Sequence, residues 1–115
     1  MSGHIKIVPN AKRVVVKAGG AVIADTRAAV TLLEGTSAGV LYIPRADANM
    51  SLLHKTSHTT TCPYKGLASY YSIPAAGAKA VNAVWSYENP IADVAGIKEY
   101  LAFYPNRVDS IEELA

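Results

Sequence analysis

The chain has 115 residues, of which 50% are hydrophobic and 17% are charged, and its formal net charge is +2. This length suits a single domain, residues 1–115, and the composition excludes an intrinsically disordered chain. Lys and Arg form no run longer than Lys12-Arg13. We therefore expect neither nucleic acid nor a membrane as a partner, because both need clustered cations.

Cys62 is the only cysteine. It excludes an internal disulfide and the paired CxxC motifs of a structural zinc site. The first residues lack the apolar core of a signal peptide, and no stretch reaches transmembrane length. These observations predict a cytoplasmic protein that holds no metal and no cofactor.

The clearest local pattern is a hairpin centred on Gly19-Gly20. Two apolar segments, residues 14–18 and 21–25, flank this pair of glycines, which suits the positive φ angles of a tight hairpin turn. Across the turn we expect Ala18 to oppose Ala21, and Val16 to oppose Ile23. Both pairs are apolar and would share one half-buried face.

Further short strands follow along the chain. Residues 26–34 fit either a helix or a strand, and the β-rich surroundings favour a strand. Residues 40–43 form a strand that Pro44 ends, and residues 45–49 form a turn. Residues 75–77 are expected to be a loop, and residues 80–88 a strand that places Trp85 and Tyr87 on one face.

One helix is predicted near the C-terminus. Asn89-Pro90 suits a helix start, and Val94, Ile97 and Leu101 form an apolar stripe at helical spacing. Residues 101–104 either finish this helix or form a last strand, and the acidic tail after Asp109 reads as a frayed helical turn. The fold class is therefore mostly β, a single small domain of curled antiparallel sheets with one C-terminal helix.

The central candidate site is the turn from Cys62 to Gly66. In a β-turn with Pro63 at its second position, Cys62 and Lys65 come close together. A neighbouring ammonium lowers the pKa of a thiol, which would make Cys62 a nucleophile and Lys65 its electrostatic activator. The alternative is a buried, inert Cys62 and a solvated Lys65, and it is favoured by the absence of a visible general base.

A metal site in this region is disfavoured. His54, His58 and Cys62 are spaced four apart, which would align them on a helix. The threonine-rich residues between them favour a strand, where that spacing separates side chains by about 13 Å. The sequence therefore predicts exposed histidines rather than ligands.

Two arginines and several aromatic residues complete the candidate site. Arg45 and Arg27 could clamp an anionic group, or pair instead with Asp25, Asp47 or Glu88. Aromatic side chains could wall a ligand cleft, although in so small a β domain they more often pack the core. The ligand-binding candidates that this gives are Arg45, Arg27, Tyr64, Tyr70, Trp85 and Glu88.

Five segments carry a resemblance to a known family. They are Gly19-Gly20-(x)3-Ala24-Asp25, Tyr42-Ile43-Pro44-Arg45, Thr61-Cys62-Pro63-Tyr64-Lys65-Gly66, Trp85-Ser86-Tyr87 and Ala102-Phe103-Tyr104. Together they resemble the bacterial domain-of-unknown-function family 427, over about residues 5–109. The resemblance implies a tent-like β fold similar to Mss-four and methionine sulfoxide reductase B.

That family is also labelled nucleotidyltransferase-like, which the residues do not support. Nucleotidyl transfer needs two or three convergent carboxylates to hold magnesium, whereas Asp25, Asp47 and Glu88 stand alone in the sequence. A sulfoxide reductase would use Cys62 but has no resolving thiol in this chain.

Three classes of function remain open at this point. The first is a domain that binds a small anionic or nucleotide-like ligand in a cleft near the Cys62–Gly66 turn. The second is a thiol-dependent enzyme that uses Cys62. The third is an interaction module whose strand edges pair with a partner or with a second copy in a homodimer.

Overall fold

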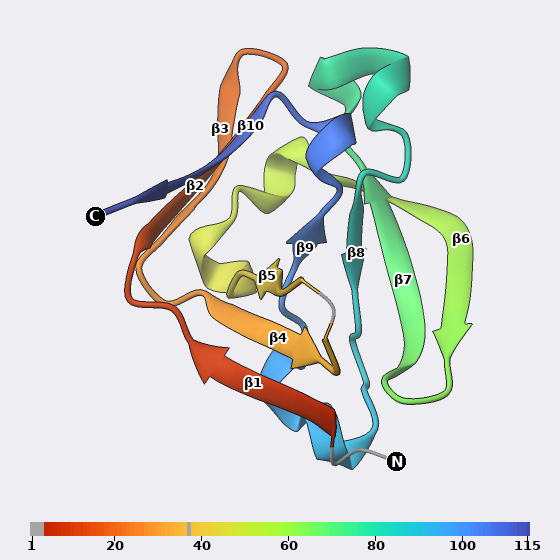
Figure 1. Ribbon diagram of the computed structural model, residues 1–115. Coiled ribbons are helices and arrows are strands. Elements are labelled where there is room, and N and C mark those ends of the chain that lie inside the picture. Colours follow the sequence, from red (N-terminus) through yellow and green to blue (C-terminus); the bar gives the residue numbers. More distant parts are fainter. Residues whose placement is uncertain (1–3, 37) are drawn as a thin grey trace.

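The computed structural model describes residues 4–36 and 38–115. Within them the chain is a mostly β domain, as predicted (Figure 1). The strands are β1 (Ile5–Pro9), β2 (Arg13–Ala18), β3 (Ala21–Thr26), β4 (Val30–Glu34), β5 (Val40–Tyr42), β6 (His54–Cys62), β7 (Gly66–Ser72), β8 (Val84–Ser86), β9 (Ala102–Phe103) and β10 (Ser110–Leu114). Short 3-10 segments lie between them, η2 (Arg45–Asp47), η3 (Met50–Leu52), η4 (Pro74–Ala80), η5 (Ala92–Ile97) and η6 (Pro105–Arg107).

The strands form three antiparallel sheets with the orders β1-β4-β5, β10-β2-β3 and β6-β7-β8-β9. In Figure 1 the β10-β2-β3 sheet lies on one side of the molecule, the β6-β7 hairpin lies on the other, and β8 and β9 lie between them. None of the helical segments in the described residues is long and apolar enough to cross a membrane.

The predicted hairpin forms, with one difference in register. Gly19 and Gly20 have φ angles of 60° and 79°, and Ala18 pairs with Ala21 as expected. The expected pairing of Val16 with Ile23 is wrong, because the register shifts after Val16 and pairs this residue with Ala24. Such a β-bulge adds one residue to one strand, and a sequence pattern of strict alternation does not reveal it.

The C-terminal helix forms only as the 3-10 segment η5. Val94 leaves helical geometry inside it, and Glu99 takes a φ of 64°. Leu101 then forms a β-bridge with Ile43 instead of a further helical turn. The stripe Val94, Ile97 and Leu101 is nevertheless fully buried, so its apolar pattern reports burial rather than an α-helix.

Three further segments differ from the expectation. The acidic tail forms strand β10, which pairs with the edge of β2. Val14, Val15 and Val16 of β2 are all buried. The loop expected at residues 75–77 belongs to η4, and the strand expected over residues 80–88 is confined to β8. The ambiguous residues 26–34 contain strand β4, as predicted.

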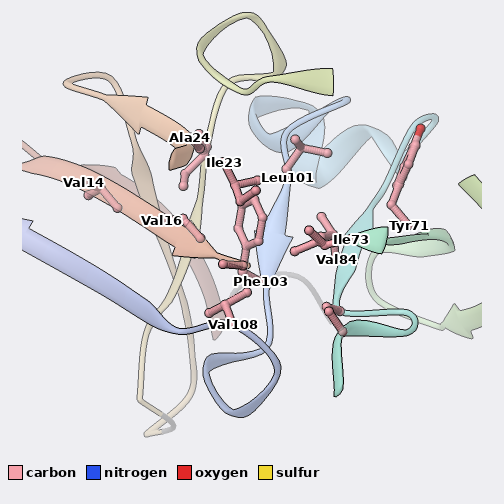
Figure 2. Packing of buried hydrophobic residues seen from close by; sticks show 14 of the residues in the cluster. Val14, Val16, Ile23, Ala24, Tyr71, Ile73, Val84, Leu101, Phe103 and Val108 are labelled. Carbon is pink, nitrogen blue, oxygen red and sulfur yellow. The ribbon is translucent and has the colours of Figure 1, made fainter. Parts of the chain in front are cut away.

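The β6-β7-β8-β9 sheet separates two hydrophobic clusters. Side chains alternate between the faces of a strand, so neighbours in sequence face opposite clusters. The cluster shown in Figure 2 includes Tyr71, Val84 and Phe103, which are register partners on one face. The other cluster includes Tyr70 and Ala102, the partners of Trp85 on the opposite face.

Candidate functional site

A cavity of about 280 Å³ opens on the second of these faces. Aromatic side chains dominate its lining, and two charged residues are present. The lining residues are Leu32, Glu34, Ala38, Val40, Tyr42, Lys65, Tyr70, Trp85, Tyr87 and Tyr104. Two predicted ligand-binding residues, Tyr70 and Trp85, and one predicted catalytic residue, Lys65, therefore share one cavity.

The strand register explains how the aromatic walls assemble. Tyr70 and Trp85 are directly opposed on β7 and β8, and Tyr87 lies two residues beyond Trp85. Tyr104 packs on Trp85, with ring centroids 4.6 Å apart. Trp85 donates its indole N–H to the hydroxyl of Tyr42 at 3.2 Å, which fixes the orientation of the indole ring. These contacts hold the walls in place without a ligand.

The predicted turn places Lys65 at this cavity. The backbone N–H of Lys65 donates to the carbonyl of Cys62 at 3.2 Å, and Gly66 takes a φ of 110°. The side chain of Lys65 is only 12% exposed, and its ammonium donates to Oε1 of Glu34 at 2.9 Å. Burial opposes the charged ammonium, but this hydrogen bond and the nearby negative charges together outweigh it and raise the pKa of Lys65. The same hydrogen bond lowers the pKa of Glu34.

Cys62 lies beside the cavity rather than in it. Its side chain is half-buried and packs against the aromatic cluster, but it does not belong to the cavity lining. The turn therefore brings Cys62 and Lys65 together in the backbone, while only the lysine faces the hollow. A chemical role for Cys62 needs a substrate that reaches it from outside this cavity.

Arg45 and Glu88 do not join Lys65, because they belong to the opposite face of the sheet. The guanidinium of Arg45 donates to the hydroxyl of Tyr71 at 2.9 Å, to that of Ser86 at 3.0 Å and to Glu88 at 3.1 Å. Its Nε donates to the carbonyl of Glu99 at 3.0 Å. We call Arg45, Glu88, Tyr71, Ser86 and Lys55 the arginine cluster.

The charges of the arginine cluster are paired within the cluster itself. Glu88 accepts hydrogen bonds from Lys55 at 2.8 Å and from Tyr71 at 2.6 Å, in addition to Arg45. Burial opposes the charged carboxylate, but the hydrogen bonds from Lys55, Tyr71 and Ser69 outweigh it and lower the pKa of Glu88 to about 2. The alternative that Arg45 pairs with Glu88 is therefore the one that the structure shows.

The remaining predicted residues lie outside the cavity. Tyr64 is 40% exposed and packs edge-on against His4, with ring centroids 5.1 Å apart. Arg27 is exposed, and the partner of nearby Asp25 is Arg13, at 2.6 Å. His54 and His58 lie on strand β6, as expected, and the described residues contain no group of three or more His, Cys, Asp or Glu side chains placed to hold a metal ion.

The sequence did not indicate the other charged and aromatic residues of the cavity, which are Glu34, Tyr42, Tyr87 and Tyr104, nor its three aliphatic ones, Leu32, Ala38 and Val40. The alternation of residues 80–88 could have identified Tyr87, because it predicts that Tyr87 and Trp85 share one face of the strand. Both residues line the cavity. Tyr42 and Glu34 come from β5 and β4, and only the tertiary fold places these strands beside β7 and β8. No local pattern identifies them.

The comparisons with known proteins add a family. Residues 6–114 match the model of a family described as a domain of unknown function, DUF427, whose label names nucleotidyl transfer. No match to a curated protein was found. The chain belongs to the DUF427 family, as the five sequence segments predict.

Proposed function

We propose that this DUF427 protein binds a small planar molecule with one acidic group in the aromatic cavity, the ring between Trp85 and the tyrosines and the acid at Lys65. The observation that carries the proposal is the enclosure of a single lysine by aromatic walls. Ligand sites are typically concave and mostly apolar, with a few polar groups that fix orientation.

The aromatic walls favour a planar ligand. Aromatic pairs gain about 0.5–1.5 kcal/mol beyond the burial of their area when ring centroids lie about 4.5–7 Å apart. The rings of Trp85 and Tyr104 are tilted by 48° to each other, so each can contact a flat ligand with part of its face or edge. The ring system of a nucleobase or of an aromatic acid fits this description.

Lys65 supplies the charged handle. An ammonium has three N–H donors, and within the described residues the structure gives this one a single hydrogen bond, to Glu34. A carboxylate or phosphate oxygen can take another of these donors without breaking the pair. Glu34 offsets part of the charge, so the cavity favours a singly charged acid over a polyphosphate.

The size of the cavity supports a small ligand. Pockets for drug-sized molecules span about 300–1,000 Å³, and this cavity, at about 280 Å³, lies just below that range. One ring with a small acidic group therefore suits it better than a whole dinucleotide.

The test is a fluorescence titration. Trp85 is the only tryptophan and lines the cavity, so its emission reports occupancy directly. We expect benzoate, a singly charged aromatic acid, to change this emission in a saturable way. Lys65→Met should weaken the binding of benzoate by about tenfold or more, because it removes a charged hydrogen bond.

The matched control is Lys55→Met. Lys55 also donates to a glutamate, Glu88, but it belongs to the arginine cluster and not to the cavity. It should leave the affinity for benzoate unchanged. Equal loss in the two variants would show that the probe responds to net charge and not to a site, and the proposal would fail.

The thiol-dependent enzyme is the second candidate. Two considerations favour it, the turn that brings Lys65 next to Cys62 in the backbone, and the likeness to methionine sulfoxide reductase B that the family resemblance implies. Alkylation of Cys62 by iodoacetamide across pH tests it. Reaction only above the ordinary thiol pKa of about 8.5 would count against a nucleophile.

A further inference from the structure

A second cavity adjoins the aromatic cavity. Its volume is about 380 Å³, and the two cavities share two lining residues, Trp85 and Val40. Trp85 and Val40 therefore border both cavities. We call this second hollow the apolar cavity.

The lining of the apolar cavity is hydrophobic and comes from both sides of the molecule. On one side, Leu41 lies on β5, Ile43 directly follows this strand, and Phe103 lies on β9. On the other side, Val16 lies on β2 and Ile111 lies on β10. Figure 1 shows β2 and β10 on one side of β5 and β9. The apolar cavity thus lies where the β10-β2-β3 sheet meets the rest of the domain.

Among the lining side chains of the apolar cavity that the structure describes, one is charged. That residue is Glu113, whose carboxylate is exposed and accepts a hydrogen bond from the side chain of Asn10 at 3.1 Å. The transfer of an alkyl group from water into such a lining is favourable in proportion to the apolar area removed from water. A negative charge placed beside Glu113 would be repelled by this carboxylate.

We propose that the ligand is an amphipathic aromatic acid whose alkyl tail passes Trp85 and occupies the apolar cavity, an inference that rests on the proposed function of the aromatic cavity. Three features of the lining define this class. Lys65 receives the acidic group, the aromatic rings receive the planar ring, and the adjoining apolar cavity receives the tail. Glu113 selects against a second acidic group at the end of that tail.

The test is the dependence of affinity on chain length, measured by the emission of Trp85. The probes are benzoate and a series of 4-alkylbenzoates, from methyl to hexyl. Each methylene buried in the apolar cavity should tighten binding by about three- to fourfold. The gain should end when the chain outgrows the cavity.

Two variants locate the tail. Ile111→Glu places a charge in the apolar cavity and should abolish the gain with chain length, while benzoate binds as before. Glu113→Lys is an exposed substitution that leaves the core intact. It should tighten the binding of a benzoate whose alkyl chain ends in a carboxylate, and leave 4-hexylbenzoate unchanged.

The outcomes separate the two proposals. If benzoate binds and the chain-length series is flat, the tail proposal is overturned and the proposed function stands. If the affinity rises with chain length but neither variant alters it, the tail lies elsewhere and the tail proposal is again overturned. If no probe binds, both proposals fail.

Discussion

The β6-β7-β8-β9 sheet carries a cation paired with a glutamate near each of its faces, and the two pairs differ in what surrounds them. Glu88 is held by Arg45, Lys55 and Tyr71 in the arginine cluster. Glu34 accepts a hydrogen bond from Lys65 in the lining of the aromatic cavity. The same residue types thus form a closed network on one face and an open pair on the other.

The difference teaches how to separate a structural ion pair from a binding one. The arginine cluster is only partly buried, with Arg45 and Glu88 each 27% exposed, but its guanidinium makes several hydrogen bonds that are lost together when Arg45 is replaced. A pair that faces an aromatic hollow keeps a donor for a ligand. Changes in the arginine cluster should therefore alter stability, and changes at Lys65 should alter binding.

The largest effect on stability is expected from Arg45→Met. This variant removes hydrogen bonds to Tyr71, Ser86, Glu88 and the carbonyl of Glu99. We expect the free energy of unfolding to fall by about 2–4 kcal/mol, measured by urea denaturation. Arg27→Met, at an exposed arginine, is the control. A similar loss in both variants would contradict a special role for the cluster.

Acid should produce the next largest effect. The pKa of Glu88 is about 2 in the folded protein and is near the ordinary value of 4.5 when the chain unfolds. A lowered pKa stabilises the fold fully above the unfolded value, and this contribution is lost as pH falls from about 4.5 to about 2. After allowance for solvent screening, the loss should be about 1–2 kcal/mol. Glu88→Gln should lose this pH dependence, and an unaltered acid profile in that variant would refute the assignment.

Lys65→Met should have a smaller effect on stability, although it has the larger effect on binding. This variant removes one side-chain hydrogen bond, to Glu34, whereas Arg45→Met removes four, and Glu34, at 33% exposed, stays accessible to water. We expect the free energy of unfolding to change by about 1 kcal/mol or less. A loss of stability as large as that of Arg45→Met would show that both ion pairs stabilise the fold equally, and this would contradict the proposed difference between the two faces.

The smallest effect is expected from Cys62→Ala. Because the thiol does not line the aromatic cavity, the dissociation constant of benzoate should not change. Titration of Trp85 emission measures it. A marked loss of affinity would place Cys62 in the site and favour the thiol-dependent alternative.

The sequence predicts local features of this protein well and tertiary ones poorly. The Gly19-Gly20 hairpin and the turn at Lys65 follow from backbone preferences of neighbouring residues, and both form. The bulge after Val16 and the pairing of the acidic tail with β2 depend on partners distant in sequence. Alternation cannot reveal them.

The candidate site shows the same division. Of the predicted site residues, Tyr70, Trp85 and Lys65 line one cavity, whereas Arg45 contacts Tyr71 instead. Tyr70 and Tyr71 are adjacent on β7 and must therefore face opposite sides of the sheet. That simple alternation separates the predicted site residues into two groups, although the side that Arg45 joins is decided by the tertiary fold.

The most direct test of the contrast between the two faces is an amide NMR spectrum recorded during titration with benzoate. We predict that the signals that shift belong to Leu32, Lys65, Tyr70 and the indole N–H of Trp85, all at the aromatic cavity. The signals of Arg45, Ser86 and Glu88 should stay in place. Shifts confined to the arginine cluster, or no shifts at all, would contradict the account.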